Sequence, residues 1–312
     1  MKTHENKKIR WLIAHEPKHL FIRTARAFAE EVEKSSQGRL SIELLTTEML
    51  AEKYGTNIEE SCLDVVKLLT KGEVEMTQTQ VSIFGEWSKN FKALDLPFLF
   101  RDHDHVTKVL EGRIGQALCS SLTNSGDMRG LAFTYSGGFR VIGSNEPITN
   151  FADFKDLRVR VNTNPVNADV MSMIGAKPHA IPFKQSYGYD LIEEGQLDAA
   201  ETTYLRFLGK YLVKTNHSMF MTVIAMNESF FQGLDSDLQE VVKTAAICAS
   251  RLEREWSIQD AKKFEEDCAV NGVTITSLSD EDQAHFREQA LKVYEKWEPY
   301  FMPGMIEHIR LQ

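Results

Sequence analysis

Ile9-Arg10-Trp11-Leu12-Ile13-Ala14 opens the part of the chain that decides the fold, because a run this apolar indicates a buried strand. An amphipathic helix is predicted over 19–34, where apolar residues recur at helical spacing. Alternation over 40–44 indicates a second strand, a helix is predicted over 57–71, and alternation returns over 74–78. This β-α-β-α-β order predicts a mostly parallel sheet covered by helices.

The second half of the chain resumes this alternation near Leu131. Leu157-Arg158-Val159-Arg160-Val161 is predicted to be a strand in which both arginines face away from the valines. Asn164-Pro165 then indicates a helix start with Asn164 as N-cap, because proline is favoured at the first helical position. The run is predicted to end with a short strand near His179, a helix over 186–194 and a strand over 197–201.

A single long helix is predicted from Leu234 to Cys268, because the pattern there is helical and contains no proline. A chain of 312 residues has room for two domains of roughly 150 residues each, and we expect this helix to brace both. The sequence contains no low-complexity linker. We therefore expect an α/β protein with two lobes, whose chain crosses between the lobes more than once.

The formal net charge of -9 argues against a nucleic-acid partner, because such binding depends on Lys and Arg that neutralise phosphates. No run approaches the roughly 18 apolar residues of a membrane span. Salt screens the repulsion between an acidic chain and an acidic small molecule beyond about 10 Å. If the ligand is an anion, buried arginines must meet its charge.

The start of the chain bears on where the protein acts. Residues 1–10 are polar and basic, and the apolar run Trp11–Ala14 that follows is short. A secretory signal needs an apolar core of about 7–15 residues. We therefore expect either a cytoplasmic protein or a mature form whose signal has been removed.

The four cysteines include no CxxC pair, which argues against zinc-ribbon and thioredoxin-like sites. Cys248 and Cys268 are predicted on one helix, where their separation in sequence corresponds to about 30 Å and lies beyond disulfide reach. Cys62 and Cys119 could meet, but two buried reduced thiols are favoured.

The sequence lacks the common motifs of catalysis, including a Walker loop, HExxH and GxSxG. Gly137-Gly138 is not followed by the third glycine of a dinucleotide-binding fingerprint. Glu193-Glu194 is expected to face solvent, and His217 is expected to be a core residue with satisfied hydrogen bonds.

Asp102-His103-Asp104-His105 carries metal-ligating atoms, but residues two apart on a helix do not face one another. Asp102 or Asp104 is predicted to cap the helix that begins there. We therefore expect no catalytic residue, no metal and no cofactor, and we expect that the chain is not an enzyme.

Six motifs stand in a fixed order along the chain. They are Pro97-Phe98-Leu99-Phe100-Arg101-Asp102, Gly138-Phe139-Arg140, Leu157-Arg158-Val159-Arg160-Val161, Gly175-Ala176-Lys177-Pro178, Gly195-Gln196-Leu197-Asp198-Ala199-Ala200-Glu201 and Lys214-Thr215-Asn216-His217. A helix start, Leu234-Asp235-Ser236-Asp237-Leu238-Gln239, has Ser236 where the pattern usually has proline. The ordered set resembles the DctP-type solute-binding proteins of tripartite ATP-independent periplasmic (TRAP) transporters, from about Ile9 to Val273.

The resemblance implies a two-lobed periplasmic-binding-protein-like α/β fold with crossing strands and a long helix spanning both lobes. We expect lobe I over 8–136 plus 226–262 and lobe II over 137–225 plus 263–312, with a ligand cleft between them that closes by a hinge motion. The family captures organic acids and delivers them to TRAP membrane permease subunits. The resemblance thus implies a periplasmic monomer without a nucleic-acid partner, and an α/β enzyme or a ligand sensor for small organic acids is the alternative.

Arg160 is the ligand contact that the resemblance implies most directly. An arginine in an apolar strand must be exposed, paired with an internal acid or bound to a ligand. Its guanidinium suits a carboxylate because two parallel hydrogen bonds fix orientation as well as charge. Arg140 is implied as a second contact, and its alternative role is to pair with a carboxylate such as Glu146 or Asp153.

The other implied contacts are mostly neutral and polar, which suits the hydroxyl groups of a sugar acid. They are Gln80, Thr163, Asn164, Phe183, Thr202 and His15. The stretch over 162–167 also resembles that of family members that take up sugar acids. A hexuronate is therefore the favoured ligand and a C4-dicarboxylate the next. Gln185, Ala199 and Thr202 depart from the residues usual in the family and leave the exact ligand open.

Overall fold

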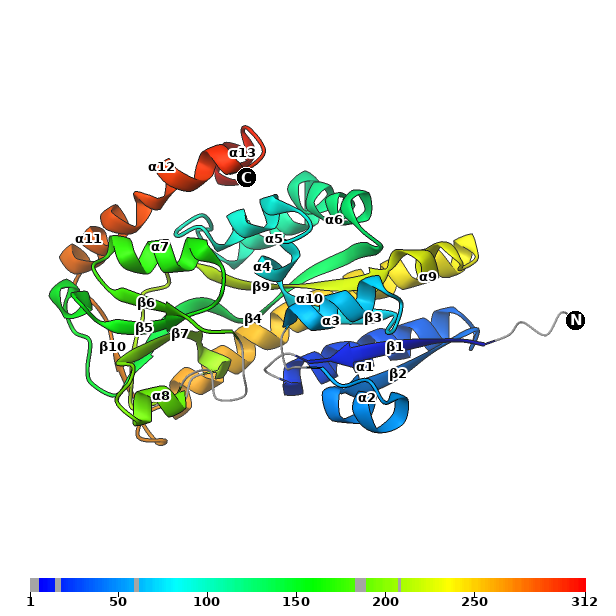
Figure 1. The fold of residues 1–312 in the computed structure, drawn as a ribbon, viewed down its shortest axis with the longest axis horizontal. Helices are drawn as coiled ribbons and strands as arrows, with labels where there is room; N and C mark the ends of the chain where they lie inside the picture. The colour runs from blue at the N-terminus through cyan, green and yellow to red at the C-terminus, as the bar shows by residue number, and fades with distance from the viewer. Residues whose placement is uncertain (1–5, 15–17, 59–61, 183–188, 207–208) are drawn as a thin grey trace, which may run out of the picture. The chain divides into compact units, whose positions relative to one another are not determined.

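The structure is a computed structural model that describes residues 6–14, 18–58, 62–182, 189–206 and 209–312. It divides into two compact units (Figure 1). Unit 1 takes in the chain up to Ser88, Leu110–Ser136 and Met221–Trp256, and unit 2 takes in the rest. The chain therefore passes from one unit to the other five times, in agreement with the expectation of more than one crossing.

The two units differ from the predicted lobes chiefly in one segment. Residues 89–109, expected in lobe I, belong to unit 2. The backbone N–H of Phe98 donates to the carbonyl oxygen of His217, and the Tyr294 hydroxyl donates to the carbonyl oxygen of Pro97. These bonds tie the segment to later parts of unit 2. Two shorter segments differ as well. Residues 221–225, expected in lobe II, belong to unit 1, and residues 257–262, expected in lobe I, belong to unit 2.

The sheet of unit 1 begins with the strand that opens the chain. β1 (Lys7–Ile13) pairs in parallel with β2 (Leu40–Thr46) on one side and with β3 (Met76–Gln80) on the other. β9 (Met219–Asn227) then pairs with β3 in the antiparallel direction. The predicted β-α-β-α-β opening is thus confirmed. The helices of unit 1 are α1 (Lys18–Ser35), α2 (Thr47–Tyr54), α3 (Cys62–Thr70), α4 (Val81–Phe84), α6 (Arg113–Ser125) and α9 (Glu228–Gln232).

Unit 1 also buries the carboxyl group of Glu253. Its oxygen Oε2 accepts from the Thr24 hydroxyl at 2.7 Å and from the Gln78 amide at 2.7 Å. Its other oxygen accepts from the hydroxyls of Thr134, at 2.8 Å, and Ser136, at 3.2 Å. Burial raises the pKa of Glu253 to about 7, although hydrogen bonds from these neutral groups act in the opposite direction.

The sheet of unit 2 is centred on the strand predicted around Arg160. β5 (Arg158–Val161) pairs in parallel with β6 (Lys177–Ala180) and β7 (Ala199–Thr203), and β7 pairs antiparallel with β4 (Met128–Ser144). Two short strands, β8 (Tyr211–Val213) and β10 (Thr274–Thr276), continue from β4.

The helices of unit 2 are η1 (Lys89–Asp95), most of α5 (His103–Glu111), η2 (Phe151–Phe154), α7 (Pro165–Met173), α8 (Tyr189–Glu193), η3 (Tyr204–Arg206), α11 (Asp280–Leu291), α12 (Val293–Trp297), η4 (Glu298–Tyr300) and α13 (Met305–Arg310). Among them, α7 packs against β5 and β6 and lies beside α11 and α12 (Figure 1).

Two glycines interrupt the long strand β4 where the chain passes from unit 1 to unit 2. Gly137 and Gly138 have φ values of 81° and 68°, in the left-handed region that favours glycine. A Cβ atom on Gly137 would lie 2.5 Å from Oγ1 of Thr203. The pair that did not fit a dinucleotide-binding motif is therefore required by the path of the backbone.

The predicted long helix is confirmed as α10 (Ser236–Asp267), which has 32 residues. It contributes the residues up to Trp256 to unit 1 and the residues from Ser257 to unit 2. Cys248 lies on this helix, whereas Cys268 lies just beyond its end. In the described parts of the chain no cysteine forms a disulfide. None of the helices there combines the length and the apolar composition that a membrane-spanning helix requires.

Candidate functional site

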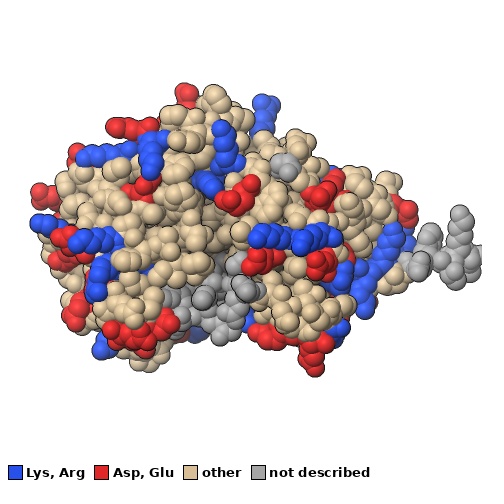
Figure 2. Space-filling view, in the orientation of Figure 1, with Lys and Arg blue, Asp and Glu red and all other residues tan. Residues whose placement is uncertain are grey.

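The surface of the protein carries charges of both signs, and Figure 2 shows Lys and Arg interspersed with Asp and Glu on the visible face. Inside unit 2 the situation is different, because several charged side chains are almost completely buried. Asp95, Arg140, Arg160, Glu201 and His217 are each at most 3% exposed. Buried charges are costly unless they are paired or bound to a ligand, so this cluster is the candidate site.

The strands of unit 2 determine which side chains enter the cluster. Val159 and Val161 are fully buried on β5, and the period of two along a strand turns Arg160 to the opposite face, as predicted. Arg160 lies in register with Ala200 of β7, the residue that precedes Glu201. On the neighbouring strand β4, Arg140 lies in register with Thr203.

Arg140 is paired within unit 2. Its Nη1 lies 3.4 Å from Oε2 of Glu201, and its Nη2 lies 3.9 Å from Oδ1 of Asp95. Its guanidinium also lies over the ring of Phe220, 5.0 Å from the centroid. The sequence-based choice of Glu146 or Asp153 as its internal partner was wrong. Asp153 instead accepts hydrogen bonds at the start of η2, where it forms a capping box with Asn150.

Glu201 is the acid at the centre of the cluster. Nε2 of His217 lies 3.0 Å from its Oε1, and Nδ1 of the same ring lies 2.8 Å from the Thr215 hydroxyl. Burial opposes ionisation of Glu201, but the charge of Arg140, the hydrogen bond and charge of His217 and the charge of Arg160 outweigh it and lower the pKa to about 2. The prediction that His217 is a satisfied core residue is confirmed.

Asp95 and Asn164 form a second buried pair. The side-chain oxygen of Asn164 accepts from the backbone N–H of Val166, which confirms the predicted N-cap of α7. Its Nδ2 donates to Oδ2 of Asp95 at 2.7 Å. Burial raises the pKa of Asp95, although Arg140 and Asn164 act in the opposite direction. Both polar atoms of the Asn164 side chain are therefore engaged inside unit 2.

Arg160 donates from Nη2 to the backbone oxygen of Ile181 at 2.9 Å. Nearby on the chain, Asn162 accepts from the backbone N–H of Asn164, but its buried Nδ2 has no hydrogen-bond partner within the described residues. The same is true of Nε of Arg140 and Oγ of Ser218. Unsatisfied buried polar atoms are rare in folded proteins, and a cluster of them indicates a place where a polar ligand or ordered water binds.

The other predicted contacts are distributed as follows. Thr163 is exposed in the bend between β5 and α7, and Thr202 is buried in β7. Gln80 belongs to unit 1, where it is buried at the end of β3. His15 and Phe183 lie outside the described residues. Within unit 2 the structure thus places Arg140 and Arg160 in one buried cluster, together with Asn164.

Sequence reasoning missed Asp95, His217 and Asn167 as members of this cluster. Nδ2 of Asn167 lies 3.4 Å from both carboxylate oxygens of Glu201. Each of the three lies in or beside one of the family motifs or a predicted helix start, but no local pattern showed that they converge. The aspartate predicted as a helix cap behaves as expected, since Oδ1 of Asp102 accepts from the backbone N–H of His105 at 2.7 Å.

Comparison with known proteins fits this architecture. Residues 13–299 match the DctP family, which is described as "Bacterial extracellular solute-binding protein, family 7". The 2,3-diketo-L-gulonate-binding periplasmic protein of Escherichia coli is 26% identical over 271 residues, covering 85% of this chain and 78% of that protein. The C4-dicarboxylate-binding protein DctB of Bacillus subtilis is 26% identical over 294 residues, covering 91% and 80%.

A solved structure shows the same fold. The TRAP periplasmic solute binding protein of Pseudomonas putida F1, determined with bound D-glucuronate, superposes with a TM-score of 0.85 at 24% identity and covers 97% of this chain and 96% of that one. The two-lobed α/β fold expected from the sequence is thus confirmed. The chain belongs to the DctP family of bacterial extracellular solute-binding proteins, which serve TRAP transporters.

Proposed function

We propose that this protein captures a small organic anion in the periplasm and delivers it, as a monomer, to the membrane permease subunits of a TRAP transporter without changing it chemically. The family assignment supports uptake, and the named relatives all bind organic acids. The observation that carries the proposal is the buried cluster of unit 2, which holds two arginines beside unsatisfied polar atoms.

Arg160 is the proposed anchor for the ligand carboxylate. Arg140 already forms ion pairs with Glu201, at 3.4 Å, and with Asp95, at 3.9 Å. The charge of Arg160 also lowers the pKa of Glu201, but it contributes less to this shift than the charge of Arg140 does. Burial raises the pKa of Asp95, although Arg140 and Asn164 act in the opposite direction. A ligand carboxylate beside Arg160 would meet its positive charge, and burial would strengthen the pairing.

The pairing of Arg140 also bears on the class of ligand. A C4-dicarboxylate needs a second cation for its far carboxylate, and the arginine available for that role is engaged with two internal acids. Neutral groups such as Asn162 and Thr202 suit hydroxyls instead. We therefore favour a six-carbon sugar acid such as a hexuronate. The relatives bind ligands of both classes, so the choice depends on these contacts.

Calorimetric titration with glucuronate, galacturonate, succinate and malate tests this proposal. We expect binding of at least one hexuronate and weak or no binding of the dicarboxylates, with the ligand recovered unchanged after long incubation. Arg160→Ala should abolish most of the affinity. Arg158→Ala is the matched control, because Arg158 lies on the same strand but is half-exposed and paired with Asp198.

Three results would overturn parts of the proposal. Binding of the dicarboxylates alone would assign Arg140 to a second carboxylate and reject the sugar acid. Equal affinity in Arg160→Ala and Arg158→Ala would remove Arg160 as the anchor. Conversion of any of the four acids would make the protein an enzyme.

A further inference from the structure

Unit 1 contains a cavity that the proposed function does not use. Its volume is about 200 Å³, and it lies where α6, β4 and α10 meet. Leu131, Ala132 and Phe133 of β4 line it, with Cys119 of α6 and Ile247 of α10. Burial raises the pKa of the Cys119 thiol to about 12, so this thiol contributes an apolar wall and no reactive thiolate.

Three charged side chains, Glu111, Arg251 and Arg254, also line the cavity. Glu111 accepts from Nε and Nη2 of Arg251 at 3.0 and 2.7 Å, and it also pairs with Nη2 of Arg254. The hydrogen bond from Arg251 and the charge of Arg254 lower the pKa of Glu111, so its carboxylate is ionised at neutral pH. Two guanidinium groups therefore share one carboxylate, and these three lining groups together carry one net positive charge.

The two arginines differ in a way that suits a binding site. The Arg254 side chain is only 6% exposed, and its Nη1 donates to the backbone oxygen of Phe133, so it is fixed in place. The Arg251 side chain is 58% exposed, and its Nη1 makes no hydrogen bond to any residue that the structure describes. This group can donate to a ligand without breaking the pairs that hold Glu111.

The shape and charge of this cavity point to one class of ligand. A cavity of about 150 Å³ with apolar walls is known to hold benzene. The present cavity is somewhat larger, and its lining includes a cationic group of side chains. We infer that it binds a small monocarboxylic acid with a compact apolar body, such as benzoate or hexanoate, with the carboxylate at Arg251 and Arg254 and the apolar body against β4.

This second site is independent of the proposed anchor. All of its lining residues belong to unit 1, whereas Arg160 belongs to unit 2. The two sites also differ in chemistry, because most of the uncharged lining here is apolar, and Gln116 and Ser250 are its neutral polar side chains. Failure of either proposal therefore leaves the other standing.

Ligand-observed NMR titration with benzoate and hexanoate tests the inference, with benzyl alcohol as the neutral analogue. We expect saturable binding of the acids and at least about tenfold weaker binding of the alcohol, the ratio that corresponds to about 1.4 kcal/mol. Arg251→Glu should weaken benzoate binding by about tenfold or more, because it reverses the charge of a residue that lines the cavity. Arg39→Ala is the control, since Arg39 pairs with Asp237 elsewhere in unit 1.

Three further variants keep the test decisive. Ala132→Leu should fill the cavity and abolish binding of the acids, and Ile247→Trp, at a position that is 40% exposed, should do the same if the first variant does not fold. Arg160→Ala should leave benzoate binding unchanged. The inference is overturned if the alcohol binds as tightly as the acid, if Arg251→Glu has no effect, if no acid binds, or if Arg160→Ala removes the binding.

Discussion

The substitution Glu253→Gln provides a direct test of how the core of unit 1 is held together. In the folded protein the carboxyl group is fully buried among Thr24, Gln78, Thr134 and Ser136, which are all neutral. Oγ1 of Thr24 also lies 3.0 Å from the carbonyl oxygen of Leu20. A protonated Glu253 can donate to Thr24, which can then donate to that carbonyl, so the geometry accommodates the neutral acid.

The size of the effect follows from the pKa. Folding raises it from the ordinary 4.5 to about 7, so between these values the native state binds more protons than the unfolded state. The free energy of unfolding therefore falls as pH rises through this window and levels off above it. At about 1.4 kcal/mol for each pKa unit, the loss is about 3 kcal/mol. Glutamine has no proton to lose, and its amide preserves a donor.

Urea unfolding at a series of pH values from about 4.5 to about 8 measures this loss. The stability of Glu253→Gln relative to the wild type should increase by about 3 kcal/mol across the series. Glu255→Gln is the matched control, because Glu255 lies exposed on the same helix, and its difference from the wild type should stay constant. A constant difference for Glu253→Gln as well would refute the reasoning, since Glu253 would then be ionised in the folded state.

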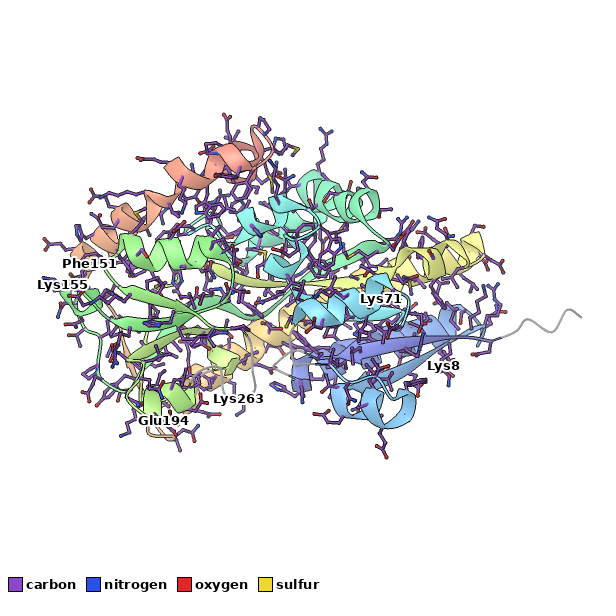
Figure 3. The ribbon with its side chains drawn as sticks, in the orientation of Figure 1. Lys8, Lys71, Phe151, Lys155, Glu194 and Lys263 are labelled. Carbon is purple, nitrogen blue, oxygen red and sulfur yellow. The ribbon has the colours of Figure 1, made fainter. Side chains whose placement is uncertain are left out.

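Three other outcomes are expected. Arg160→Ala should lose roughly 2–5 kcal/mol of ligand affinity. Arg160→Lys should recover only part of this loss, because one ammonium cannot replace two parallel hydrogen bonds. Wild-type affinity of Arg160→Lys, measured by calorimetry, would contradict this. Glu201→Gln should lower the free energy of unfolding by about 3–5 kcal/mol, because it leaves the buried charge of Arg140 poorly paired. Glu194→Gln, at an exposed position at the end of α8 (Figure 3), should change it little, and equal urea midpoints for the two variants would contradict the pairing. The hinge closure expected from the family resemblance predicts a smaller radius of gyration by X-ray scattering with saturating ligand, and an unchanged profile would argue for a rigid pocket.

The elements that the sequence predicts well are those whose pattern is local. The strand around Arg160 follows from the period of two along Val159 and Val161, and the start of α7 follows from Asn164-Pro165. The long helix α10 follows from a helical pattern without proline. In each case neighbouring residues alone determine the conformation, so a single sequence is sufficient to predict it.

The partners of buried charges are different, because they come from distant parts of the chain. Arg140 and Glu201 are 61 residues apart, and they meet because β4 and β7 pair in the sheet. Glu146 and Asp153 are nearer in sequence, but Asp153 is used to cap η2. Strand order and register decide which acid an arginine meets, and neither can be derived from the local pattern.

The division of the chain between the units also has a consequence for how the protein folds during synthesis. Unit 1 contains the first strands together with β9 and most of α10, and the hydroxyl of Thr24 bonds to a carboxylate 229 residues later. Contacts between such distant residues form slowly, because the intervening chain must first be brought together. When the first half of the chain leaves the ribosome, it lacks the strand and helix that complete its core. We therefore expect apolar strands such as β1, which are buried in the folded protein, to stay exposed until most of the chain has been made, and we expect the nascent chain to be prone to aggregation until then.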